Sequence, residues 1–277
     1  MTRAALIQLN SSDDPVANLR DTVAFIRNAA GAGAKFILTP EATNCVSASR
    51  THQNNVLMPE GEDTTLAALS ALALELKIWL LIGSIALKTS DSDGRFANRS
   101  FLISPTGQII ARYDKIHMFD VTVSKTEVYR ESAGYRPGRA AVVAQTDFGP
   151  VGMSICYDLR FAYLYRQLAH AGAQILTVPS AFSPVTGAAH WEALLRARAI
   201  ETGCYVLAPA QVGTHDCSVG KPRKTWGHTL AVAPWGEVLV DGGTDVGFSL
   251  VDIDLAQVEA ARSRIPSLSH DRNFEGP

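Results

Sequence analysis

The chain has 277 residues, 47% of them hydrophobic and 19% charged, which is usual for a soluble globular protein. At roughly 100–200 residues per domain, this length allows one large domain or two small ones. Its 25 basic and 27 acidic side chains leave a net charge of −2, so it lacks the basic excess typical of proteins that bind nucleic acid or anionic membranes. No apolar run reaches the roughly 18 residues of a membrane span, and the apolar start is too short for a signal peptide.

The four cysteines are widely spaced and form no Cys-X-X-Cys pair, which indicates neither a disulfide framework nor a zinc cluster. They are Cys45, Cys156, Cys204 and Cys217. No Pro/Gly/Ser-rich linker, block of like charge or internal repeat divides the chain. We therefore expect one domain over residues 1–277 and a cytoplasmic location.

Short apolar runs alternate with stretches of helical period, which favours a layered α/β domain. The predicted strands are residues 4–9, 35–40, 78–83, 98–104, 109–113, 141–145, 151–155, 174–178, 205–210, a pair around 234–236, and 246–253. The predicted helices are residues 14–31, 64–77, 159–170, 188–202 and 255–264. The apolar face expected for the first helix is Val16, Leu19, Val23, Ile26 and Ala30. Residues 118–138 have weak periodicity and predict a long surface loop, a feature that is usually functional.

Glu41, Lys115 and Cys156 each stand within two residues of the end of a predicted strand, where α/β folds place their sites. A helix is expected soon after Cys156, and a helix start favours the anionic form of a thiol. Singly, each residue has an ordinary explanation, because free cysteines are usually buried and a lone charge is usually solvated. Together they supply a nucleophile, a base and a cation for an oxyanion, the set that acyl transfer requires.

The segments around these three residues carry a family resemblance. They read Phe36-Ile37-Leu38-Thr39-Pro40-Glu41, Arg112-Tyr113-Asp114-Lys115-Ile116-His117-Met118-Phe119 and Gly152-Met153-Ser154-Ile155-Cys156-Tyr157-Asp158-Leu159-Arg160-Phe161. They are similar, in this order, to the glutamate, lysine and cysteine segments of the nitrilase superfamily of carbon–nitrogen hydrolases. The resemblance runs from residue 3 to about residue 273 and implies an α-β-β-α sandwich.

The resemblance also implies a role for each matching residue. Cys156 would attack an amide carbonyl and form a thioester, and Glu41 would be the general base that takes the thiol proton. Lys115, together with the backbone N–H of Tyr157, would stabilise the oxyanion. The superfamily carries a second glutamate that holds the lysine, and Glu131 is its best match here.

For that second glutamate, Glu127 in the same loop is the weaker alternative. What is known of the superfamily implies that no metal or organic cofactor is needed. Its members commonly form dimers. The resemblance therefore implies a homodimer that acts on a small-molecule amide, with no nucleic-acid or membrane partner.

The second half of the chain resembles one branch of the superfamily, which contains deaminated glutathione amidase and omega-amidase. The matching segments are Pro179-Ser180-Ala181-Phe182, Thr186-Gly187-Ala188-Ala189-His190-Trp191-Glu192, Arg196-Ala197-Arg198-Ala199-Ile200-Glu201 and Trp226-Gly227-His228. Both relatives cleave amides of 2-oxo dicarboxylic acids. The resemblance implies an amidase that releases ammonia from such a monoamide. Ala210-Gln211-Val212-Gly213 favours deaminated glutathione amidase, a metabolite-repair enzyme, and omega-amidase acting on 2-oxoglutaramate or 2-oxosuccinamate is the alternative.

An anionic substrate requires a cation in its pocket. We predict Arg160 for this role, because a guanidinium can bind a carboxylate bidentately. The alternative is an ion pair of Arg160 with Asp158 or Glu192. The residues predicted to contribute to the pocket besides Arg160 are Tyr157, Phe182 and Thr186, while His117 is expected to support the site through hydrogen bonds.

Other functions stay open at this point. Within the superfamily they are an N-carbamoyl amino acid amidohydrolase or a true nitrilase, although true nitrilases tend to carry Cys-Trp-Glu where this chain has Cys156-Tyr157-Asp158. A catalytically silent binding protein of the same fold is a rival from another class. No phosphate-binding glycine motif supports a nucleotide-dependent enzyme. The loop at residues 121–136 follows neither relative of the branch, and we expect it to cover the mouth of the pocket.

Overall fold

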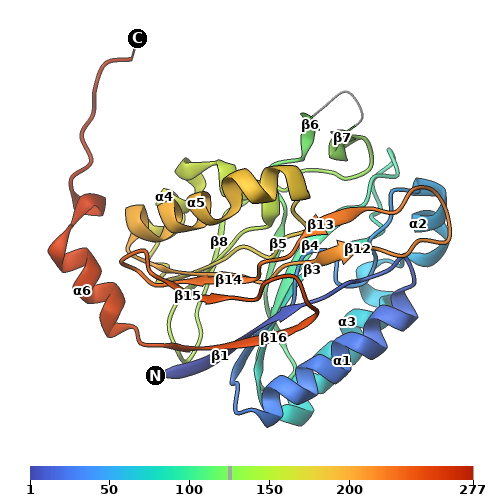
Figure 1. Ribbon diagram of the computed structural model, residues 1–277, viewed down its shortest axis with the longest axis horizontal. Coiled ribbons are helices and arrows are strands. Elements are labelled where there is room, and N and C mark those ends of the chain that lie inside the picture. The colour runs from blue at the N-terminus through green and yellow to red at the C-terminus, as the bar shows by residue number, and fades with distance from the viewer. Residues whose placement is uncertain (124–126, 277) are drawn as a thin grey trace.

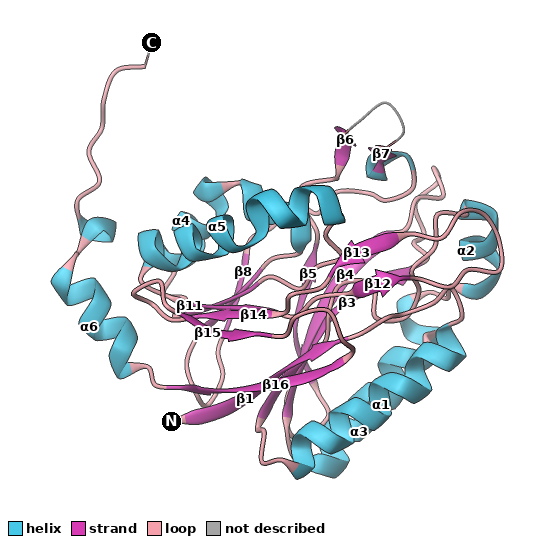
Figure 2. Ribbon diagram, viewed as in Figure 1, coloured by secondary structure: helices cyan, strands magenta, loops and turns pink. Residues whose placement is uncertain are grey.

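Two six-stranded sheets lie face to face, and helices cover the outer face of each (Figures 1 and 2). The computed structural model describes residues 1–123 and 127–276. The first sheet consists, in spatial order, of β16 (Gly247–Ile253), β1 (Thr2–Gln8), β2 (Phe36–Leu38), β3 (Trp79–Leu87), β4 (Ala97–Ile103) and β5 (Ile109–Asp114). The second consists of β15 (Val238–Asp241), β14 (Leu230–Val232), β11 (Tyr205–Ala208), β10 (Ile175–Thr177), β9 (Val151–Met153) and β8 (Val142–Ala144).

Helices form the two outer layers. In Figure 1, α1 (Pro15–Gly31) and α3 (Thr64–Leu76) lie against the first sheet, and α4 (Ala162–His170) and α5 (Pro184–Thr202) lie against the second. The remaining elements are α2 (Arg50–Val56), α6 (Ala256–Arg264), short 3₁₀ turns at Glu60–Glu62, Glu131–Ala133, Cys156–Arg160 and Ser267–Ser269, and two small hairpins described below. The predicted α/β fold with an α-β-β-α sandwich is confirmed.

The core explains why the central strands read as unbroken apolar runs. In β2, Phe36 and Leu38 belong to the cluster between the two sheets, while Ile37 belongs to the cluster under α1 and α3. In β1, Leu6 and Ile7 divide in the same way. Successive side chains of a strand point to opposite faces, so a strand covered on both faces needs apolar residues at every position.

The first helix is predicted correctly, and four of the five residues of its expected apolar face, Leu19, Val23, Ile26 and Ala30, pack in the cluster beneath it. Asp14 caps it by accepting hydrogen bonds from the N–H groups of Val16 and Ala17. The fifth, Val16 in the first turn, is 75% exposed. The buried face includes the polar Asn18, whose side-chain amide donates to the carbonyls of Ser12 and Asn44 and so ties the helix to its neighbouring loops.

The segment at residues 118–138 is more ordered than the long loop we predicted. It contains the hairpin of β6 (Asp120–Thr122) and β7 (Val128–Arg130), followed by the 3₁₀ turn that begins at Glu131. Both strands are only three residues long, which is too short to give a periodic signal. Residues 124–126 of this segment, which also fall within the predicted pocket-covering loop, lie outside the described residues.

A second hairpin, of β12 (Val212–Thr214) and β13 (Lys224–Trp226), is absent from the prediction, as is α2. Its strands are also three residues long, and the connection between them is rich in polar residues. The hairpin joins the segment after β11 to the segment before β14. This hairpin lies at the same end of the sandwich as the β6–β7 hairpin (Figure 1).

Candidate active site

The three residues singled out at strand ends line one cavity of about 610 Å³. Glu41 and Lys115 come from the ends of β2 and β5 in the first sheet, and Cys156 comes from the end of β9 in the second. All three are buried, with exposed fractions of 6% or less. The site therefore lies where the ends of both sheets meet, and it is assembled only when the two sheets pack together.

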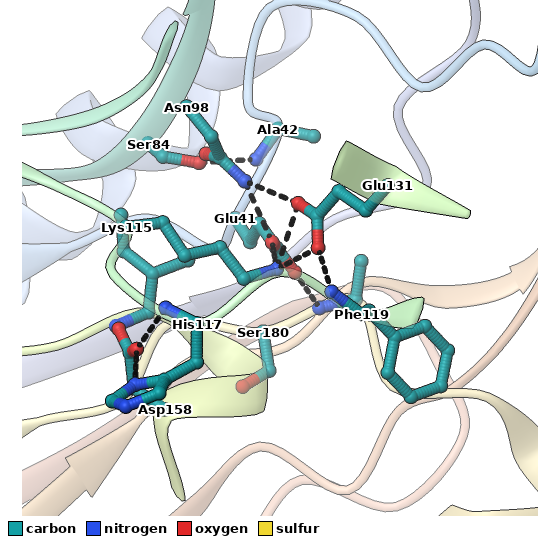
Figure 3. A network of polar contacts seen from close by, with 12 residues as sticks. Glu41, Ala42, Ser84, Asn98, Lys115, His117, Phe119, Glu131, Asp158 and Ser180 are labelled. Atoms are coloured by element: carbon teal, nitrogen blue, oxygen red, sulfur yellow. Dashed lines mark hydrogen bonds and ion pairs between the residues drawn. The ribbon is translucent and has the colours of Figure 1, made fainter. Parts of the chain in front are cut away.

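The carboxylate of Glu41 is held on both oxygens (Figure 3). Its Oε1 accepts hydrogen bonds from Lys115 Nζ at 2.8 Å and from Asn98 Nδ2 at 2.9 Å. Its Oε2 accepts from the backbone N–H of Ala181 at 2.9 Å. Three donors on one buried carboxylate favour its ionised form and fix its direction.

Lys115 lies between two carboxylates. Its ammonium is 2.8 Å from Glu41 Oε1 and 2.9 Å from each oxygen of Glu131. Glu131 in turn accepts from the backbone N–H of Phe119 at 2.7 Å (Figure 3). The structure thus brings Glu131 into the site. Glu127 also lines the cavity, but its carboxylate accepts from Tyr129 and Ser183.

A single glycine lets the segments that carry these groups approach one another. A Cβ at Gly83 in β3 would lie 2.0 Å from the carbonyl oxygen of Thr39 and 2.5 Å from Pro179 Cβ. Thr39 lies just before Glu41, and the carbonyl of Pro179 accepts the backbone N–H of Cys156 at 3.0 Å. Any larger residue at position 83 would push the base and the thiol apart.

Cys156 adopts a left-handed backbone conformation with φ of 48°, which is unusual for a residue other than glycine. It begins the 3₁₀ turn Cys156–Arg160, and α4 starts only at Ala162. The helix predicted from residue 159 is therefore wrong in its first turn, and no α-helix N-terminus points at the thiol. The strained turn instead raises the thiol above the sheet, beside the Glu41 carboxylate.

The ionisation of these groups follows from their mutual charges. Burial alone would raise the pKa of Glu41, but the charges of Lys115 and Arg223 hold that pKa below its usual value. Burial would likewise lower the pKa of Lys115, but Glu131 and Glu41 hold it well above its usual value. The pKa of the Cys156 thiol is raised by burial and by the charge of Glu41. Both causes favour the protonated thiol of Cys156, beside a carboxylate whose ionised form is favoured.

A second buried carboxylate, Asp158, supports the turn that carries Cys156. Its side chain is fully buried and accepts from Ile155 N at 2.9 Å and Tyr113 Oη at 2.7 Å on Oδ2. Its Oδ1 accepts from the backbone N–H of His117 at 3.0 Å and lies 2.7 Å from His117 Nδ1 (Figure 3). His117 thus takes the supporting part expected of it.

The predicted pocket residues divide into two groups. Tyr157, Phe182 and Thr186 line the cavity. Arg160 is not among the described residues that line it, and its predicted contact with substrate stays a prediction. Its guanidinium carbon lies 5.6 Å from the centre of the Phe182 ring and 5.9 Å from that of Tyr157, and its Nη2 is 3.3 Å from His190 Nδ1. Among the described residues Asp158 contacts His117 and Glu192 pairs with Arg196, so neither alternative ion pair of Arg160 forms there.

Most of the chain matches one family model. The family model described as carbon–nitrogen hydrolase matches residues 3–263. The chain belongs to this family. It is 38% identical over 272 residues to a protein of Yersinia enterocolitica named deaminated glutathione amidase, covering 97% of this chain and 92% of that protein. It is 36% identical over 271 residues to human omega-amidase NIT2, covering 98% and 95%.

A solved structure of the same superfamily has the same fold. The crystal structure of Saccharomyces cerevisiae Nit3, described as a member of branch 10 of the nitrilase superfamily, matches this carbon–nitrogen hydrolase with a TM-score of 0.84 at 28% identity. The match covers 96% of this chain and 94% of that chain. The predicted membership of the nitrilase superfamily is confirmed.

Three residues of the carbon–nitrogen hydrolase site were missed in the sequence. Asn98 in β4 and the backbone of Ala181 both bind Glu41. Arg223, just before β13, lines the cavity. No local pattern marks Asn98 or Ala181, since both reach the site through packing of distant segments. For Arg223 the one available signal is the basic cluster Lys221, Arg223 and Lys224.

Two features are absent from residues 1–123 and 127–276. In that part of the chain no helix is long and apolar enough to cross a membrane. Among the same residues, no group of three or more His, Cys, Asp or Glu side chains is arranged to hold a metal ion.

Proposed function

We propose that the protein is an amidase that uses Cys156 as its nucleophile, Glu41 as its general base and Lys115 as the cation for the oxyanion. One observation carries this proposal: a thiol, an ionised carboxylate and a buried ammonium line a single cavity, with the ammonium bound to the carboxylate at 2.8 Å. A silent binding protein would have no use for a buried cluster of charges around a strained cysteine, because burying charges is costly.

The reaction is proposed to run in two halves. In the first, Cys156 Sγ attacks the amide carbonyl carbon while its proton passes to Glu41, and the negative oxygen of the tetrahedral intermediate is stabilised by Lys115 and the backbone N–H of Tyr157. Glu41 then gives the proton to the departing amine, leaving a thioester. In the second half, Glu41 takes a proton from water as its oxygen attacks the thioester carbon; the C–S bond then breaks, Glu41 returns the proton to Cys156 Sγ, and the carboxylic acid leaves.

We propose a monoamide of a 2-oxo dicarboxylic acid as the substrate. The names of the relatives support this, since deaminated glutathione and omega-amides are both of that kind. The two candidates differ in what leaves. A primary amide such as 2-oxoglutaramate gives ammonia, whereas deaminated glutathione gives cysteinylglycine, so the expected release of ammonia applies only to primary amides. A cavity of about 610 Å³ has room for the longer substrate.

The deciding experiment measures formation of 2-oxoglutarate, the product that both substrates share. We expect a higher kcat/KM for deaminated glutathione than for 2-oxoglutaramate, and the reverse preference would indicate an omega-amidase. Turnover of neither would refute the proposed substrate class. The Cys156→Ala variant should have no activity while unfolding at the same urea concentration as wild type, and substantial residual turnover would exclude the thioester route.

We also propose a cytoplasmic homodimer that acts in metabolite repair. Support for association comes from apolar side chains exposed on one helix, Val185 and Ile200 of α5. Sedimentation equilibrium should give twice the chain mass of 29.7 kDa, and a mass of one chain at micromolar concentration would exclude the dimer.

A further inference from the structure

Arg223 occupies a position next to the candidate general base. It lines the cavity, and its Nη2 donates to the carbonyl oxygen of Ala181 at 2.7 Å. The N–H of the same residue, Ala181, donates to Glu41 Oε2 at 2.9 Å. The backbone of Ala181 therefore binds the Arg223 guanidinium through its carbonyl and the Glu41 carboxylate through its N–H. Arg223 is thereby held close to the place where the amide bond of the substrate would lie.

The hydrogen-bonding capacity of Arg223 is largely unused. A guanidinium has five N–H donors. Within the described residues Arg223 makes the one hydrogen bond to Ala181, and its Nε is buried without a partner. The ring of Tyr129, with its centre 5.9 Å from the guanidinium carbon, supports one face of the group. A buried donor without a partner costs free energy, so such an arrangement favours a ligand that supplies acceptors.

The other arginines of the cavity are occupied. Arg50 donates to the carbonyls of Ala133 and Gly94. Arg130 donates to the carbonyls of Val121 and Tyr129 within its own hairpin. Lys115 is neutralised by two glutamates, and the lysines on either side of Arg223 are exposed. Among the described residues that line the cavity, Arg223 is thus the arginine with a buried donor, Nε, that has no partner.

We infer that Arg223 binds the carboxylate of the acyl part of the substrate, the 2-oxo acid group that lies a few carbon atoms from the scissile amide. This inference rests on the proposed function, since only an anionic acyl group would use it. A guanidinium binds a carboxylate through two parallel hydrogen bonds, which gives both affinity and a fixed orientation. The anchored carboxylate would set the distance from the anchor to Cys156 and so select short dicarboxylic monoamides.

The test compares two amides that differ only in this carboxylate. 2-Oxoglutaramate carries it, and 4-oxopentanamide has a methyl group in its place; both release ammonia on hydrolysis. Arg223→Met should lower kcat/KM for 2-oxoglutaramate by about 10²-fold, the size expected for loss of a charge-assisted pair. The same variant should change kcat/KM for 4-oxopentanamide by less than about threefold. Arg160→Met, which removes the arginine outside the cavity, should leave the ratio of the two values within about threefold of wild type.

An equal loss on both amides would overturn the inference, because it would show that Arg223 acts through Glu41 or the fold. No loss on either would overturn it as well. If wild type hydrolyses neither amide, the proposed substrate class fails, and binding of 2-oxoglutarate to Cys156→Ala by calorimetry decides the role of Arg223 separately. There we expect a dissociation constant about 10²-fold higher once Arg223→Met is added, and either equal constants or no binding would refute the anchor.

Discussion

Replacing Asp158 with asparagine tests whether the buried carboxylate behind Cys156 holds the nucleophile turn in place. The change keeps the size of the side chain and removes its charge. Asp158 has no exposed surface, and each of its oxygens accepts two hydrogen bonds. An asparagine can accept with one oxygen only, so its amide group must face two donors, for example Ile155 N and Tyr113 Oη.

The expected loss follows from this count. Two charge-assisted hydrogen bonds are lost, at about 1.5–3 kcal/mol each, which gives about 3–6 kcal/mol. A domain of this size has a total stability of roughly 5–15 kcal/mol, so Asp158→Asn should unfold at a much lower urea concentration. Because Ile155 directly precedes Cys156, kcat should fall as well, although Asp158 does not line the cavity.

Urea denaturation followed by tryptophan fluorescence measures the change in the free energy of unfolding. Asp252→Asn is the matched control, since Asp252 is half exposed and pairs with Arg3 on the surface. That control should cost less than about 1 kcal/mol. A loss below about 1 kcal/mol for Asp158→Asn would refute the reasoning, because it would show that the four bonds are not needed to hold the turn.

Two further predictions concern other charged groups. Lys115→Ala should lower kcat by at least about 10²–10³-fold, the loss typical of one oxyanion donor, and a change confined to KM would show that Lys115 binds only the ground state. Burial lowers the pKa of His215 from 6.5 to about 4, so the unfolded chain takes up a proton below pH 6.5 that the folded chain refuses. The stability supplied by neutral His215 is therefore present above pH 6.5 and lost between pH 6.5 and 4, on the order of 2–3 kcal/mol. Urea titrations of wild type and His215→Gln at pH 7 and 4.5 check this, and parallel losses in both would contradict it.

Sequence reasoning located Glu41, Lys115 and Cys156 because each follows directly from a strand, and strand ends are visible in the sequence. The sandwich itself could be predicted from the apolar runs together with the family resemblance. The polar part of the buried face of α1 could not, because Asn18 is held by hydrogen bonds to loop carbonyls and not by hydrophobicity. Periodicity detects apolar burial only.

Arg223 was missed for a related reason. Arg160 belongs to the motif around Cys156, but nearness along the chain does not decide which side chains line the cavity. Arg223 is 67 positions from Cys156 and reaches the cavity on a hairpin with strands of three residues, which leave no pattern in the sequence. Contacts of this kind depend on the packing of the two sheets.

The charges of the site explain why a thiol with a raised pKa can serve as a nucleophile. At rest, Glu41 and Glu131 are ionised and Lys115 is protonated, so these three groups carry a net charge of −1. Ionising Cys156 would add a second negative charge to a buried site, which is why its pKa is raised. When the proton passes to Glu41 as sulfur attacks, the charge of Glu41 is replaced by that of the oxyanion, and the net charge stays at −1. The site therefore disfavours a free thiolate but not the tetrahedral intermediate, and Lys115, already placed beside Glu41, needs no reorganisation to stabilise it.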